Sequence, residues 1–119
     1  MADAPMTVVE TAEFLKHAAR LMPDREREEL VAFVAANPEA GEIMPETGGV
    51  RKLRWARKGM GKRGGTRVIY YYHSERLPVF LLTVYPKNRK ANLNKAERNA
   101  MKRLVPILVT EYPRKARKT

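Results

Sequence analysis

The sequence predicts an α+β fold with two N-terminal helices, an antiparallel sheet of three or four strands and a C-terminal helix. Apolar residues recur at helical spacing through residues 11–36, whereas residues 50–85 carry β-branched and aromatic runs between turn residues. Asn94 and Glu97 then form the capping-box pattern that opens a further helix. A chain of 119 residues suits a single domain, 1–119, whose basic tail from about residue 113 to 119 we expect to fray.

The N-terminal segment predicts two antiparallel helices. Residues 11–22 place apolar side chains on one wide face, and residues 25–36 form a second helix with Asp24 as its N-cap. Pro38 ends this helix, because the residue before a proline disfavours the helical conformation. Upstream, residues 6–9 fit either a short strand or the first turn of a helix that a capping box of Thr7 and Glu10 would begin.

Three segments then read as strands, at residues 50–56, 67–73 and 78–85, and the last two form a hairpin. Alternation along the first strand places Leu53 and Trp55 on one face and Lys52 and Arg54 on the other. In the final helix, Pro106 should end or kink the chain, because its ring clashes with the preceding turn.

Charge is the most unusual property of the chain. The net charge is +11, and the stretch from Arg51 to Arg67 is rich in Lys, Arg and Gly and contains no acidic residue. Like charges at close range repel one another, so such a stretch indicates an anionic partner. We expect this partner to be nucleic acid and the inactive protein to be held by an acidic protein. No apolar stretch approaches a membrane span and the N-terminus does not resemble a secretory signal, so we expect a cytoplasmic protein without membrane contact.

The sequence offers no metal or cofactor site. It has no cysteine and only two histidines, far apart in the chain, so we expect neither a metal nor a cofactor. His73, at the hairpin turn, is a minor candidate for acid–base chemistry, and His17, inside the first helix, is given no role. The two-histidine chemistry of many ribonucleases is therefore not expected.

Basic residues instead provide a candidate catalytic group. If the strands pair as predicted, Lys52, Arg54, Arg67 and Lys87 converge on one side of the sheet. RNA carries its own nucleophile in the 2′-hydroxyl, so cations that stabilise a dianionic phosphorane are sufficient for much of the chemistry. A lysine crowded by cations gives up its proton more readily, which makes Lys52 a candidate general base. Consecutive tyrosines at 70–72 add a possible stacking surface for an unpaired base, although ordinary sheet packing is the commoner role of any one of them.

Two stretches, GGVRKLRWARKGMGKRGGTRVIYYY and VFLLTVYPKNRKANLNKAE, closely resemble the RelE/HigB-type toxins of bacterial type II toxin–antitoxin systems, within the RelE/ParE superfamily. The resemblance covers roughly residues 48–97. It implies a small RelE-like fold and a metal-independent messenger-RNA endonuclease that acts in the ribosomal A site and blocks translation. It also implies that the protein binds the ribosome, messenger RNA and a cognate antitoxin, which is usually a HigA-like helix-turn-helix protein. The complex would contact DNA only through this antitoxin.

The resemblance also implies roles for particular residues. Lys52 and Arg54 would serve acid–base work and phosphate binding, Arg67 would stabilise the transition state, and Lys87 would assist the leaving group. Some members stack a base on a tyrosine where this chain has residues 92–94, so that role is vacant or falls to Tyr85 or Tyr71. The residues expected to bind RNA or the ribosome are Arg51, Arg57, Lys58, Lys62, Arg63, Tyr71, Tyr85, Arg89 and Lys90.

Two other functions compete with this reading. One is a non-catalytic basic module that binds RNA or ribosomes through the same cations. The other is a DNA-binding protein, which is weaker because the sequence shows no helix-turn-helix and no basic helix suited to a major groove.

Overall fold

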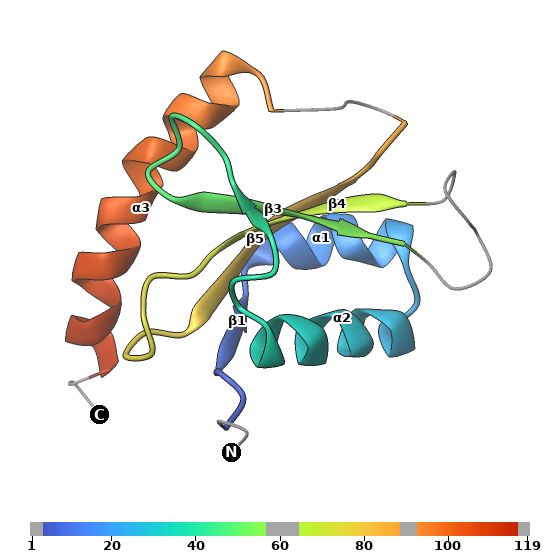
Figure 1. Cartoon of the computed structure of the whole chain (residues 1–119), viewed down its shortest axis with the longest axis horizontal. Coiled ribbons are helices and arrows are strands. Elements are labelled where there is room, and N and C mark those ends of the chain that lie inside the picture. Colours follow the sequence, from blue (N-terminus) through green and yellow to red (C-terminus); the bar gives the residue numbers. More distant parts are fainter. Residues whose placement is uncertain (1–3, 57–64, 89–92, 117–119) are drawn as a thin grey trace.

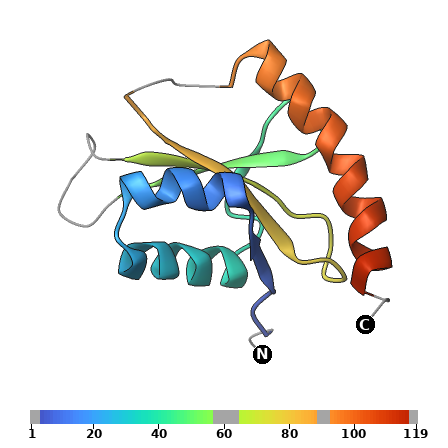
Figure 2. The same ribbon diagram turned by 180° about the vertical axis from the view of Figure 1, so that it is seen from behind.

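A computed structural model describes residues 4–56, 65–88 and 93–116 of the chain, with side chains described as far as residue 112. A five-stranded sheet lies between a two-helix layer on one face and a single long helix on the other (Figures 1 and 2). The elements, in chain order, are β1 (Val8–Glu10), α1 (Ala12–Leu21), α2 (Asp24–Ala36), β2 (Glu42–Ile43), β3 (Val50–Trp55), β4 (Thr66–Tyr71), β5 (Val79–Pro86) and α3 (Lys95–Ala116). The predicted α+β class is confirmed.

The sheet has more strands than the three or four predicted. Its order is β1-β5-β4-β3-β2, with the central strands β3, β4 and β5 antiparallel, as expected from the hairpin. The two additional strands have three and two residues, too few for alternation to show in the sequence. Parallel pairing of β1 with β5 decides the open choice at residues 6–9, because Val8 lies opposite Val79 and Glu10 opposite Leu81. This segment is therefore a strand and not a helical turn.

Each face of the sheet has its own hydrophobic core. On the face covered by α1 and α2, Phe14 and Leu30 pack against Leu53, Val68 and Tyr70. On the opposite face, the side chains that pack with α3 include Val50, Ile69, Tyr71, Phe80, Leu82 and Val105. Successive residues of a strand point to opposite faces, so the sheet is buried on both sides. In β5 this alternation shifts at an irregularity opposite Ile69 and Tyr70, so Leu81 and Val84 lie on one face and Leu82 and Tyr85 on the other.

The two N-terminal helices begin differently. Thr11 caps α1, since its Oγ1 accepts the Phe14 amide at 3.2 Å and donates to the Leu81 carbonyl at 2.7 Å. The same hydroxyl thus starts the helix and ties it to β5. The predicted N-cap of α2 is wrong by one position, because Asp24 is already the first helical residue and Pro23 occupies the cap without a side-chain bond. A carboxylate in the first turn still interacts favourably with the helix dipole.

The C-terminal helix begins as predicted and continues further than predicted. Asn94 Oδ1 accepts the Glu97 amide at 2.8 Å, and Glu97 Oε1 accepts the Asn94 amide at 2.9 Å, which completes a reciprocal capping box. The helix then runs through Pro106 to Ala116. Of the two predicted effects of Pro106, an end to the helix is therefore wrong, and a kink stays a prediction. Pro106 is exposed while Val105 beside it is buried, so packing of the apolar face holds the helix together across the proline. None of the helices in the described ranges has the length and hydrophobicity needed to cross a bilayer.

Candidate functional site

Three side chains form a row across the central strands near the end of the sheet where β4 begins. Arg54 on β3 lies directly opposite Arg67 on β4, and Arg67 lies directly opposite Tyr85 on β5. Side chains in such positions have Cβ atoms about 5 Å apart. All three project from the face that carries α3, because Leu53 and Val68 project from the other.

The long helix leaves this row uncovered. The middle of α3 lies near the start of β3, where Val105 approaches Gly48 and a Cβ built on that glycine would lie 3.6 Å from the Val105 Cβ. Further along the helix, the ring of Tyr112 meets Phe80 edge to face at a centroid separation of 5.5 Å. Figure 1 shows α3 beside that end of the strands, with the opposite end of β3 and β4 extending away from it. The row thus lies at the open end of a face whose other end is core.

Arg67 is the most unusual member of the row, because the residue as a whole is largely buried. The residue is only 9% exposed, and within the described part of the chain its side chain forms no ion pair or hydrogen bond. The two segments that join this end of the sheet, 57–64 and 89–92, contain no Asp or Glu. An arginine that is partly removed from water and has no ion pair to a described carboxylate favours the binding of an external anion.

The two lysines of the predicted site lie at the edges of this row. Lys52 is two residues before Arg54 on β3 and therefore on the same face of the sheet. Lys87 follows the end of β5, and its backbone amide donates to the Gly65 carbonyl at 3.1 Å. Gly65 is itself close to Arg67, since a Cβ there would lie 3.9 Å from Arg67 Nη1. The strand register places Lys52, Arg54 and Arg67 on one face of the sheet, and Lys87 follows the end of β5. Convergence of the four side chains on one site stays a prediction.

The surroundings of Lys52 differ from those predicted. Its partner across to β2 is Glu42, its partner across to β4 is Ile69, and Arg51 projects from the other face of the sheet. The sequence-based picture of a lysine crowded only by cations is wrong in this respect, because one of its neighbours in register is a carboxylate. Sequence could not show this, since β2 has only two residues.

Tyr85 connects the row to the start of α3. Burial raises the pKa of the Tyr85 phenol above its usual value of 10.0, the charge of Arg67 opposes this rise, and Glu97 adds to it. The phenol therefore stays protonated at neutral pH and lies in the field of both Arg67 and Glu97. Glu97 was predicted only as a capping residue, and the capping box that fixes its side chain also brings its charge near this row.

Two predicted RNA-binding residues lie away from the row. Arg51 is on the face covered by α1 and α2, and its Nη1 donates to the carbonyls of Gly41 at 2.8 Å and Glu39 at 3.1 Å. Tyr71 is 5% exposed inside the core beneath α3, and its hydroxyl lies 3.0 Å from Nδ1 of His73. Neither side chain therefore joins the row, and contact of either with RNA stays a prediction. The strand alternation that pairs Lys52 with Arg54 already places Arg51 on the opposite face.

Other predicted contacts cannot be placed. Six of the basic residues expected to bind RNA or the ribosome lie outside the described residues: Arg57, Lys58, Lys62, Arg63, Arg89 and Lys90. Their segments leave the sheet directly beside the row, because 57–64 joins β3 to β4 and 89–92 follows β5. The described residues also contain no cluster of His, Asp or Glu side chains suited to a metal ion.

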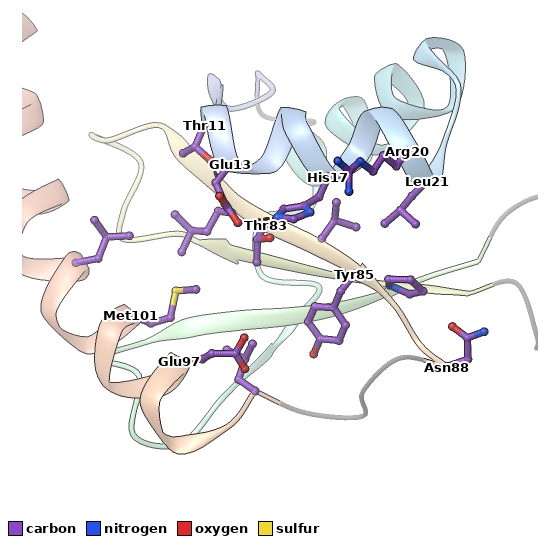
Figure 3. A pocket seen from close by; sticks show the side chains of 15 residues that line it. Thr11, Glu13, His17, Arg20, Leu21, Thr83, Tyr85, Asn88, Glu97 and Met101 are labelled. Carbon is purple, nitrogen blue, oxygen red and sulfur yellow. Dashed lines mark hydrogen bonds and ion pairs between the residues drawn. The ribbon is translucent and has the colours of Figure 1, made fainter.

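A cavity of about 970 Å³ adjoins the row along β5. It lies between α1 and α3, where β5 extends beyond its pairing with β1, and Tyr85 forms part of its wall. Figure 3 shows Glu13 and His17 projecting from α1 on one side of the cavity, with Tyr85 and Glu97 on the other. His17 Nε2 lies 2.7 Å from Glu13 Oε2, an i,i+4 pair that the sequence analysis did not single out.

Comparison with known proteins agrees with this architecture. The family model described as the RelE toxin of the RelE/RelB toxin–antitoxin system matches residues 6–115. Among solved structures, the E. coli toxin RelE, as a double arginine-to-alanine mutant in the free state, superposes with a TM-score of 0.54. That match has 16% sequence identity and covers 88% of this chain and 100% of the E. coli chain, so it bears on the fold alone.

Proposed function

The chain belongs to the RelE toxin family of toxin–antitoxin systems, and we propose that it is an endoribonuclease that cleaves messenger RNA in the ribosomal A site. Cleavage of the messenger would stop translation, and a cognate antitoxin would hold the toxin inactive. We further propose that this antitoxin is a HigA-like helix-turn-helix protein, that it alone links the complex to DNA, and that the toxin works in the cytoplasm.

The observation that carries this proposal is the position of Arg67, a largely buried arginine in register between Arg54 and Tyr85. Arg54 directly opposite another cation is unfavourable in the free protein. A phosphodiester placed over the row removes the repulsion and satisfies the donors of both guanidinium groups. The same arrangement favours the transition state more than the substrate, because the phosphorane carries one additional negative charge.

The proposed reaction uses the substrate's own hydroxyl. The 2′-oxygen attacks the adjacent phosphorus as the bond to the 5′-oxygen breaks, leaving a 2′,3′-cyclic phosphate and a free 5′-hydroxyl. Lys52 acts as the general base that accepts the proton of the 2′-hydroxyl, and Lys87 donates a proton to the departing 5′-oxygen. Arg54 binds the phosphate, and Arg67 stabilises the charge that develops on its non-bridging oxygens.

Cleavage in a translating reaction on a defined messenger, mapped by primer extension, tests the proposal. We expect cuts within codons that require ribosomes and that Arg67→Ala or Lys52→Ala reduces by about two orders of magnitude or more. Arg25→Ala removes an equal charge from an exposed position on α2 and should leave the cuts unchanged.

The same experiment separates the enzyme from a non-catalytic binder. If translation stops without any cuts, the protein acts by occupying RNA or the ribosome, and the catalytic roles above are wrong. In that case Arg67→Ala should weaken binding modestly and in a salt-dependent manner.

A further inference from the structure

Trp55 is the last residue of β3 and lies on the face of the sheet opposite the row. It follows Arg54 directly, so Arg54 projects towards the α3 side and Trp55 towards α1 and α2. The Trp55 carbonyl accepts a hydrogen bond from Oγ1 of Thr66 at 3.2 Å, which ties the end of β3 to the start of β4. A cation of the row and an aromatic ring are therefore neighbours in the chain but lie on opposite faces of the sheet.

The indole ring of Trp55 is only partly buried, although it packs at the edge of a hydrophobic core. The ring of Phe33 on α2 packs against it, with a centroid separation of 5.6 Å and an interplanar angle of 54°. Phe33 is itself 38% exposed. We refer to Trp55 and Phe33 as the Trp55 platform. Two supported aromatic rings at a surface provide a site on which a flat ligand can stack.

A cavity of about 500 Å³ lies beside the Trp55 platform, between the start of α2 and the end of β3. Its volume falls within the range of about 300–1,000 Å³ that small-ligand sites occupy. Trp55 lines it together with Pro23, Arg25, Glu26 and Glu29, so two carboxylates face one cation. Carboxylates repel a phosphate, but they accept hydrogen bonds from the amino groups of bases. The cavity therefore suits the base of a nucleotide better than its phosphate.

The outer edge of β3 offers a strand of RNA a route from one face of the sheet to the other. Within the described residues, β2 pairs only with Arg51 and Lys52, so it leaves the edge at Arg54 and Trp55 uncovered. A strand whose phosphate lies on Arg54 can turn around this edge. A neighbouring base then reaches the indole of Trp55.

We propose that the Trp55 platform stacks an unpaired RNA base next to the nucleotide whose phosphate lies on the row. Single-stranded RNA is commonly held by cations that contact the phosphates and by aromatic rings that stack the bases. In this protein the two kinds of contact occupy opposite faces at the end of one strand. A duplex does not fit the platform, because its bases are already stacked on one another. The inference rests on the proposed function in that RNA is the ligand, but stacking requires no cleavage.

Fluorescence provides a direct test, because Trp55 is the only tryptophan in the chain. The first probe is a short single-stranded RNA with methylated 2′-hydroxyls, which lacks the nucleophile and cannot be cleaved. The matched probe has the same length and the same phosphates but no bases. We expect the first probe to quench the emission of Trp55, because a base stacks on the indole. The second probe should bind through its phosphates and leave the emission unchanged.

The affinity of variants for labelled probes, measured by fluorescence anisotropy, tests the same contact. Trp55→Leu keeps an apolar side chain and removes the ring, so its affinity for the probe with bases should fall by about tenfold. Its affinity for the probe without bases should not change. Trp55→Phe keeps an aromatic surface and should retain most of the affinity for bases. Tyr72→Leu makes a comparable change beyond the opposite end of β4 and should affect neither probe. Circular dichroism verifies that each variant is folded.

Two results would overturn the inference. One is quenching of Trp55 to the same extent by both probes. The other is an equal loss of affinity for both probes in Trp55→Leu, which would mean that Trp55 only supports the fold. Arg67→Ala, by contrast, should weaken both probes equally, because its contact is with phosphate.

The titrations contain no ribosomes and no cleavage step, so they are read independently of the proposed nuclease activity. Base-dependent quenching in a protein that cuts no messenger would support the stacking site and refute only the nuclease. Cleavage of messenger without base-dependent quenching would support the nuclease and refute only the stacking site.

Discussion

Replacing Arg67 with methionine should stabilise the protein while it abolishes activity. Methionine keeps an unbranched apolar chain of similar reach and removes a charge that is 9% exposed, with no carboxylate bound to it in the described structure. It also removes repulsion from Arg54, its direct partner across the strands. Like-charged cross-strand pairs cost about 0.5 kcal/mol, and replacing buried charges with apolar side chains of similar volume often stabilises by about 1–4 kcal/mol.

We expect a net gain in the free energy of unfolding of about 1–2 kcal/mol, at the low end because Arg67 lies at the open end of the sheet. For a domain of this size that gain corresponds to a rise in Tm of about 4–8 °C. Cleavage should fall by about two to three orders of magnitude, because the group that stabilises the phosphorane is gone. Calorimetry and the primer-extension assay measure the two effects on the same protein preparation.

Arg51→Met provides a matched control for Arg67→Met, since it makes the same chemical change on the neighbouring strand β3. Its guanidinium donates to the Gly41 and Glu39 carbonyls and lies 3.9 Å from the Glu39 carboxylate. This variant should therefore lose about 1 to 2 kcal/mol of the free energy of unfolding, with a lower Tm. It should retain cleavage. If Arg67→Met lowered Tm to the same extent, Arg67 would be a structural residue with satisfied donors, and the argument for an anion site would fail.

Three further predictions concern stability. Tyr70→Phe should lower the free energy of unfolding by about 1–3 kcal/mol, measured by denaturant titration. The Tyr70 hydroxyl accepts a hydrogen bond from the Gly41 amide and donates one to the Pro38 carbonyl, both at 2.8 Å. An unaltered free energy of unfolding would contradict this. Asn94→Ala should lower it by about 1 kcal/mol through loss of the capping box, with a matching drop in helical ellipticity. Burial raises the pKa of Tyr85 in the folded protein above its usual value of 10.0. The free energy of unfolding should therefore fall as the pH rises above 10, because the phenol then ionises more readily in the unfolded chain. In the Tyr85→Phe variant, the free energy of unfolding should fall less steeply with pH.

Much of the fold could be predicted because the signals are local. Apolar spacing located α1 and α2, β-branched runs located the three central strands, and Asn94 with Glu97 marked the start of α3. The errors occur where packing outweighs local preference. Pro106 is tolerated because the helix is held on the sheet by its apolar face, and β1 and β2 exist because longer strands offer them an edge to pair with.

For the site, alternation along β3 determined which residues share a face, and the net charge of +11 predicts an anionic partner. Only the tertiary structure decided which cations are buried and what lies beside them. Arg67 is buried among neighbouring strands, and Tyr71 is covered by α3. Lys52 lies in register with Glu42, which belongs to a strand of two residues. Charge and periodicity are properties of the chain itself and can be read along it. Burial and cross-strand neighbours depend on contacts between segments far apart in sequence, so they arise only when the sheet and its helices are assembled.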